Sequence, residues 1–194
     1  MTGRTHDVAA VAAVSLMAFR QPLPPLDAVT LAACAVATFT GGLAPDLDKP
    51  GSSLWRRLPG GGVLARVARP AFVGGHRNLS HSLPGGVLFA LLARAALLAL
   101  PEGYFRPVPV WTCFVVAYVS HLVMDTLTEA GVPWLFPFGG TIGFPPMRRW
   151  RIKSGGWFEH GVVLPILWGV ILATWRAHLP EIIALLRSLG AGAH

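Results

Sequence analysis

Residues 120–131, SHLVMDTLTEAG, end an apolar run that begins near Val108. They place His121 and Asp125 four residues apart, which puts both side chains on one face of a helix. Ionisable groups at the end of an apolar helix are costly and usually face a cavity or a charged partner. The pair is therefore a candidate to bind one ion or two neighbouring ions. The alternative is a hydrogen-bonded contact between two packed helices.

The composition predicts a membrane protein. Of 194 residues, 53% are hydrophobic and 13% are charged, and the mean hydropathy is +0.55. A soluble domain of this size is usually about a quarter charged. The length suits a single domain over residues 1–194. The net charge of +7 relates first to membrane topology and anionic lipid headgroups, so we expect membrane lipids and no nucleic acid as partners.

Five hydrophobic segments predict an all-α bundle of about five transmembrane helices. They cover residues 8–19, 26–44, 83–100, 108–127 and 161–175. About 20 helical residues cross the hydrocarbon core, so the first segment is short and we expect the other helices to shelter it. The tail HLPEIIALLRSL has the pattern of an amphipathic helix at the membrane interface.

The basic residues predict the orientation of this bundle. Two long connections, residues 49–81 and 128–160, are rich in lysine and arginine, whereas the other two connections are short and carry little charge. Because cytoplasmic loops carry the excess of positive charge, we expect both long connections on the cytoplasmic side. The chain is then a multi-pass protein of the inner (cytoplasmic) membrane with a cytoplasmic N-terminus.

This topology gathers the uncommon polar residues at one end of the bundle. Each lies at the cytoplasmic end of a hydrophobic segment: His6, Asp46, Asp48, His76, His81, His121, Asp125, Glu159 and His160. A set of histidines and carboxylates without cysteine suits Zn²⁺, Mn²⁺ or Fe²⁺ better than Ca²⁺. The sequence therefore predicts a divalent-metal site at the cytoplasmic helix ends. Taken singly, each residue has a structural alternative, such as a turn cap, a surface histidine or a headgroup contact.

The same motifs resemble those of a known family. LAPDLDKPGS, HRNLSHSL and SHLVMDTLTEAGVPWLFPF follow one another as they do in the YdjM-like family of membrane-bound metal-dependent hydrolases, over roughly residues 5–165. The motif order is more distantly similar to that of zinc-dependent phospholipases C. The resemblance implies a metal site formed by His6, Asp46, Asp48, His76, His81, His121 and Asp125. The family usually has Thr where Ser80 stands, and often Gly where Asn78 stands.

Together these features predict a membrane-bound metal-dependent hydrolase. We expect it to cleave an ester or phosphoester of a lipid or lipid-linked substrate at the cytoplasmic membrane surface, with two or more divalent ions, zinc first. Glu159 is the candidate base that orients water, and Arg77, with Arg148 and Arg149, would attract an anionic headgroup. Two alternatives remain open: a divalent-metal transporter, and a non-catalytic scaffold with a structural metal. The sequence identifies no protein partner.

Overall fold

The structure is an all-α bundle, as the sequence predicts. The computed structural model describes residues 1–20, 26–49, 51–52, 55–56, 59–68, 78–101 and 103–191. The helices in chain order are α1 (Gly3–Ala18), α2 (Ala28–Leu43), η1 (Ala44–Asp48), α4 (Gly61–Ala68), α5 (Leu83–Leu98), α6 (Pro107–Thr126), η3 (Arg148–Trp150), η4 (Glu159–Val163), α7 (Leu164–Ala177) and α8 (Leu179–Ala191).

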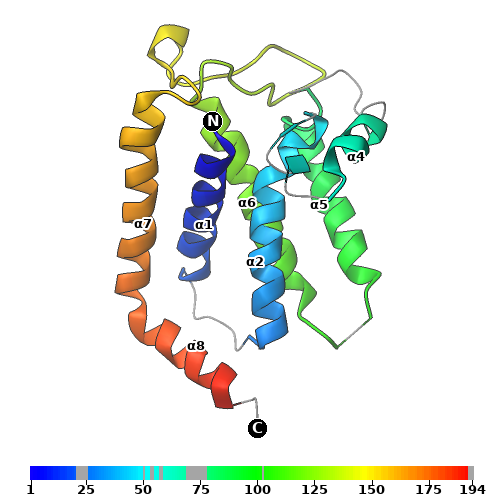
Figure 1. Ribbon diagram of the computed structural model, residues 1–194, viewed down its shortest axis with the longest axis vertical. Coiled ribbons are helices and arrows are strands. Elements are labelled where there is room, and N and C mark those ends of the chain that lie inside the picture. The colour runs from blue at the N-terminus through cyan, green and yellow to red at the C-terminus, as the bar shows by residue number, and fades with distance from the viewer. Residues whose placement is uncertain are drawn as a thin grey trace.

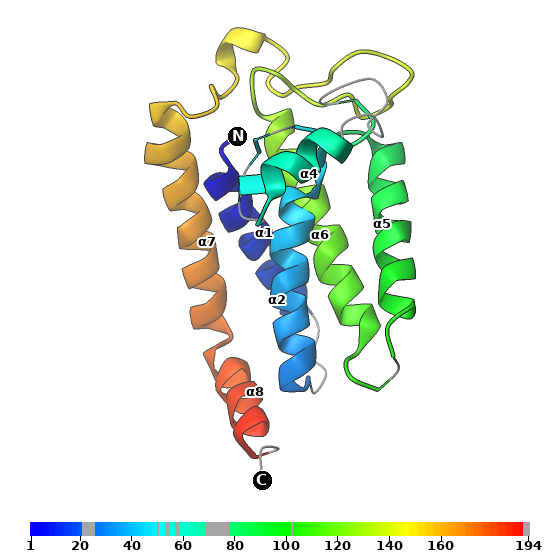
Figure 2. The same cartoon turned by 45° about the vertical axis from the view of Figure 1, so that its right-hand side comes forward.

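Helix α6 is the centre of the bundle. It packs against α1, α2 and α5, while α7 packs against α1 on the other side. These five helices run side by side, and α8 turns away at the end opposite to the chain's N-terminus (Figures 1 and 2). We call the end that carries the N-terminus the site end.

Three helical stretches are long and apolar enough to cross a membrane: Ala28–Asp48, Pro107–Thr126 and Glu159–Ala177. Helices α1 and α5 have 16 residues each, which extends them over about 24 Å, against about 30 Å for the hydrocarbon core. Helix α1 is sheltered as expected, because α2, α6 and α7 all contact it. The bundle thus agrees with the predicted segments, and two of the five are shorter than a full span.

Helix α2 approaches α6 closely because glycine faces it. A Cβ atom at Gly41 would lie 2.3 Å from the carbonyl oxygen of Phe114 on α6. One turn further along the chain, Pro45 is the second residue of the 3-10 helix η1. Proline has no backbone N–H and cannot continue the α-helical hydrogen-bond pattern. Helix α2 therefore ends against α6 and delivers the two aspartates of η1 to the site end.

A long connection folds back over the end of α6. We call residues 127–158 the roof segment; it crosses the site end of the bundle in both views (Figures 1 and 2). A backbone hydrogen bond from Phe144 N to Thr126 O, at 2.8 Å, attaches it to α6, and one from Ile152 N to Leu127 O, at 2.9 Å, joins its two ends. The roof segment is thus attached directly to the helix that carries His121 and Asp125.

The tryptophans of the long connections differ in exposure. Trp55 is 8% exposed and donates from Nε1 to Leu47 O at 2.8 Å. Its indole therefore packs beside η1. Trp150 and Trp157, in the roof segment, are 61% and 80% exposed, and tryptophan is a residue type enriched at membrane–water interfaces.

Candidate metal centre

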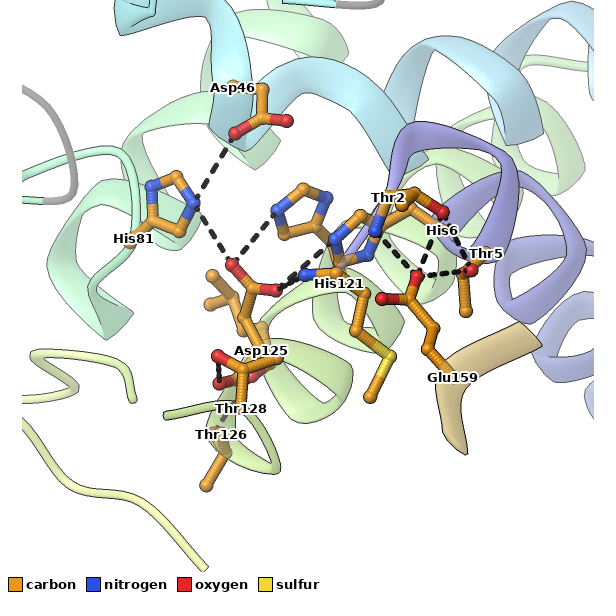
Figure 3. A network of polar contacts seen from close by, with 12 residues as sticks. Thr2, Thr5, His6, Asp46, His81, His121, Asp125, Thr126, Thr128 and Glu159 are labelled. Atoms are coloured by element: carbon orange, nitrogen blue, oxygen red, sulfur yellow. Dashed lines mark hydrogen bonds and ion pairs between the residues drawn. The ribbon is translucent and has the colours of Figure 1, made fainter. Parts of the chain in front are cut away.

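Four buried side chains converge at the site end of the bundle. His6 comes from α1, His81 from the turn before α5, and His121 and Asp125 from α6 (Figure 3). Each is at most 1% exposed. Asp46, from η1, lies at the edge of this group with its side chain 17% exposed. Residues separated by as many as 119 positions therefore meet in one cluster, as the predicted topology requires.

Asp125 is the hub of the cluster. Its Oδ1 atom lies 3.2 Å from His6 Nε2 and also contacts the amino group of Met1. Its Oδ2 atom lies 3.7 Å from His81 Nε2 and 3.8 Å from His121 Nε2. Both carboxylate oxygens therefore face imidazole nitrogens.

The imidazole rings themselves are in contact. The rings of His6 and His121 stack with their centroids 3.6 Å apart and their planes inclined by 8°. The ring of His81 stands edge-on to that of His121, with centroids 5.3 Å apart. Three imidazoles at these separations cannot all carry a positive charge without strong repulsion. Neutral imidazole is also the form that binds a metal ion.

A backbone carbonyl fixes the tautomer of His121. Its Nδ1 atom lies 2.7 Å from the carbonyl oxygen of Gly42, in the last turn of α2, where helical carbonyls have no partner within the helix. A carbonyl only accepts, so the proton of the neutral ring is on Nδ1. The lone pair of Nε2 then points to Asp125, an arrangement typical of metal-binding histidines.

The cluster fits a divalent metal ion. Two overlapping groups each place one ligand atom per residue within 4.8 Å of the others: His6, His121 and Asp125 form one, and Asp46, His81 and His121 the other. A tetrahedral zinc ion with bonds of about 2.0–2.2 Å separates its ligands by roughly 3.3–3.6 Å, close to the spacings around Asp125. Within the described residues, His121 Nε2, the atom that faces Asp125, is buried without a hydrogen-bond partner, as expected of a metal ligand.

The remaining predicted ligands occupy different places. Asp48 is buried beside the cluster, and its Oδ2 atom accepts a hydrogen bond from Ser80 at 2.5 Å. His76 and Arg77 lie outside the described residues. His160 is exposed. His6 was expected to precede the first helix, but α1 begins at Gly3, so His6 lies in its first turns and its ring points into the bundle.

Glu159 anchors the start of α1. Its Oε1 atom accepts hydrogen bonds from Thr2 N at 2.7 Å, Thr2 Oγ1 at 2.8 Å and Thr5 Oγ1 at 2.5 Å. Its Oε2 atom accepts from Gly155 N at 2.7 Å. The carboxylate thus ties the roof segment and η4 to the helix that carries His6 (Figure 3). Its role as a base remains a prediction.

Sequence reasoning missed the polar residues that support the cluster: Thr2, Thr5, Ser80 and the carbonyl of Gly42. One signal was available. Each histidine of the described cluster follows a hydroxyl residue, in the pairs Thr5–His6, Ser80–His81 and Ser120–His121. In the first two pairs the hydroxyl donates to a buried carboxylate, Glu159 or Asp48.

The fold and the cluster define a helical membrane protein with a buried His/Asp group that could hold a metal ion. The family model described as "YdjM inner membrane protein" matches residues 1–191. The chain therefore belongs to the YdjM family.

Curated relatives agree with this assignment. The inner membrane protein YdjM of Escherichia coli (strain K12) is 37% identical over 148 residues, which cover 72% of this chain and 64% of that protein; the YdjM of Shigella flexneri gives the same values. The uncharacterized protein YvsG of Bacillus subtilis (strain 168) is 29% identical over 137 residues, 71% of this chain and 74% of that protein. The chain thus spans less than two thirds of the length of the two YdjM relatives. No solved structure matches it significantly.

Proposed function

We propose that the protein is a membrane-bound metal-dependent hydrolase that cleaves an ester or phosphoester of a lipid or lipid-linked substrate at the cytoplasmic membrane surface. The observation that carries the proposal is the convergence of three imidazoles and two carboxylates, with Nε2 of His121 directed to Asp125. A bound divalent ion supplies Lewis-acid polarisation of the substrate and activation of water. Zinc suits this donor set, with manganese or iron as alternatives.

The residues of the site end have separate proposed roles. His6, His81, His121, Asp46 and Asp125 hold the metal, and His76 and Asp48 complete the ligand set implied by the family resemblance. Asp46 is the most exposed member of the described group, so substrate and water reach the centre beside η1. Glu159 remains the candidate base, and Oε2, which accepts a single hydrogen bond, is the oxygen that could take a proton.

The roof segment supports a lipid substrate. Residues 130–158 contain Arg148, Arg149, Arg151 and Lys153 and no acidic residue. Large exposed aromatic side chains accompany them, with Phe138 80% exposed and Trp150 61% exposed. Aromatic and basic side chains together favour the headgroup layer of an anionic leaflet. Arg148 and Arg149, with Arg77, would therefore attract an anionic headgroup to the site end.

A screen of lipid and small-molecule esters tests the proposal. The protein would be purified in nanodiscs of anionic or neutral phospholipid, loaded with Zn²⁺ or Mn²⁺, and assayed against fluorogenic carboxylic esters, phosphomonoesters, phosphodiesters and labelled lipids. We expect turnover that a chelator abolishes and added metal restores. Asp27→Ala, a carboxylate at the far end of α2, should keep that turnover and His121→Ala should lose it. Metal-loaded protein that cleaves no member of the panel would refute the hydrolase.

The burial of His6, His81, His121 and Asp125 favours a second candidate, a structural metal in a non-catalytic membrane scaffold. Structural metal sites are closed, whereas catalytic sites keep an open coordination position. The two candidates differ in the screen. A structural metal predicts bound metal and lower thermal stability after chelation, without turnover of any substrate.

A further inference from the structure

Ser80 lies between a buried carboxylate and a buried imidazole. It is 3% exposed, in the turn that precedes α5. Its hydroxyl donates to Asp48 Oδ2 at 2.5 Å, and the same oxygen lies 3.1 Å from Nδ1 of His81. Because the single hydroxyl proton goes to Asp48, the oxygen of Ser80 is left to accept from His81. The Nδ1 atom of His81 is therefore the protonated nitrogen.

The consequence falls on the other nitrogen of His81. A neutral imidazole with its proton on Nδ1 carries its lone pair on Nε2. That atom lies 3.7 Å from Asp46 Oδ1 and 3.7 Å from Asp125 Oδ2, on the side of the ring where the metal centre lies. The opposite tautomer would place a hydrogen on Nε2 and block it as a ligand.

We propose that Ser80 is a positioning residue of the metal centre. Its hydroxyl, which is oriented by donating to Asp48, accepts a hydrogen bond from His81 Nδ1. This contact keeps His81 in the tautomer that presents Nε2 to the ion. Asp48 thus orients His81 indirectly, by holding the hydroxyl of Ser80, in addition to its predicted role as a ligand. The metal-binding consequence rests on the proposed function, whereas the tautomer of His81 does not.

The surrounding contacts separate this role from simple support of the turn. The hydroxyl of Tyr118 donates to the backbone carbonyl of Ser80, and Ser82 caps α5 by accepting from Gly85 N at 3.1 Å. The Ser82 hydroxyl also donates to Leu79 O at 2.7 Å. The turn is therefore held by several contacts besides the Ser80 side chain, whose own partners are Asp48 and His81.

Two histidines of the centre each donate a hydrogen bond from Nδ1 to a fixed oxygen. His121 donates from Nδ1 to Gly42 O at 2.7 Å, as His81 donates from Nδ1 to Ser80. In metalloproteins, removal of such a partner typically weakens metal binding by about 10–100-fold, because it fixes both the tautomer and the ring orientation. Gly42 contributes a carbonyl that no substitution removes, so Ser80 is the partner that mutagenesis can test.

Two flanking serines give a matched pair of variants. Ser80→Ala and Ser82→Ala each remove one buried hydroxyl beside His81, but only the first removes its Nδ1 partner. We expect Ser80→Ala to weaken Zn²⁺ binding by about 10–100-fold in competition with a chromophoric chelator. Ser82→Ala should bind Zn²⁺ like the wild type while unfolding at a lower temperature. Ser80→Thr keeps the hydroxyl and should restore wild-type affinity. Equal affinities in the two alanine variants would overturn the role of Ser80.

The tautomer can be read without any metal. Long-range ¹H–¹⁵N correlation spectra of the metal-free protein with ¹⁵N-labelled histidine assign the protonated nitrogen of His81 directly. We expect Nδ1–H in the wild type and in Ser80→Thr, and a population of Nε2–H in Ser80→Ala. A wild-type His81 that carries its proton on Nε2 would overturn the proposal. Wild-type protein that shows Nδ1–H yet binds no metal would instead refute the proposed function and leave the Ser80 contact standing.

Discussion

Replacing Glu159 by Gln tests how α1 is held in the bundle. Three donors converge on Oε1, namely Thr2 N, Thr2 Oγ1 and Thr5 Oγ1, and Gly155 N donates to Oε2. A glutamine has one oxygen and one –NH₂ group. If its oxygen keeps the three donors, its –NH₂ group faces the N–H of Gly155. The opposite rotamer is worse, because its –NH₂ group, itself a donor, then faces the three donors from Thr2 and Thr5.

The loss of stability follows from these contacts. A hydrogen bond to a charged group contributes about 1.5–3 kcal/mol and a neutral one about 0.5–1.5 kcal/mol, so each retained bond weakens by roughly 1 kcal/mol. Gly155 is exposed, and water can satisfy its N–H, so losing that bond costs about 1 kcal/mol. Because three bonds share one oxygen they do not add fully. We expect the free energy of unfolding to fall by about 2–4 kcal/mol.

Unfolding by SDS titration in mixed micelles measures this change. The control is Glu181→Gln, on α8, whose carboxylate is 52% exposed and meets only His178 at 3.4 Å among the described residues; it should change stability by at most about 0.5 kcal/mol. Zinc content should persist in Glu159→Gln, because the four donors to Glu159 do not belong to the metal cluster. Wild-type stability in Glu159→Gln would refute the anchoring of α1. Wild-type stability combined with lost turnover would assign Glu159 to catalysis alone.

Two further predictions concern packing and acid sensitivity. Gly41→Ala would place its Cβ 2.3 Å from Phe114 O and should lower the free energy of unfolding by about 1–3 kcal/mol. Gly169→Ala, in α7 with nothing within 4 Å of its Cβ among the described atoms, should be neutral or stabilising, and equal effects of the two would contradict the close α2–α6 contact. At the far end of α2, donation from the side chain and then the backbone of Thr30 lowers the pKa of Asp27. The stabilising contribution of the Asp27 carboxylate is therefore present above its ordinary pKa of 3.8 and lost as the pH falls through the lower folded value. Asp27→Asn should flatten the acid end of a pH–stability profile. An unchanged profile would exclude this cap.

The sequence predicts the bundle and the convergence of its polar residues well. Apolar runs such as residues 108–127 are long enough to require helices in a membrane, and alternation of the helices places their polar ends on one side. His121 and Asp125 share a helical face through local geometry alone. No three-dimensional information is needed for either step, so His6, His81, His121, Asp125 and Asp46 meet where the topology puts them.

The contacts that surround the cluster are not predictable in this way. Ser80 meets Asp48 across 32 positions, and Glu159 meets Thr5 across 154 positions. Such pairings depend on the angle and depth at which the helices pack. Side-chain volume determines both, and hydropathy does not. The burial of Trp55 beside η1 is another case, because the amphipathic indole suits the headgroup layer and the protein interior equally well. His76 and Arg77 stay predictions, since they lie outside the described residues.

The central claim is that the buried His/Asp cluster holds a divalent metal ion. Elemental analysis of the purified protein, beside His121→Ala and the far-end control Asp27→Ala, tests it most directly. We predict about one or more equivalents of zinc, manganese or iron per chain in the wild type and in Asp27→Ala, and a loss of that metal in His121→Ala with membrane insertion intact. A wild-type protein that remains metal-free after exposure to these ions, or a His121→Ala protein with undiminished metal content, would contradict the account.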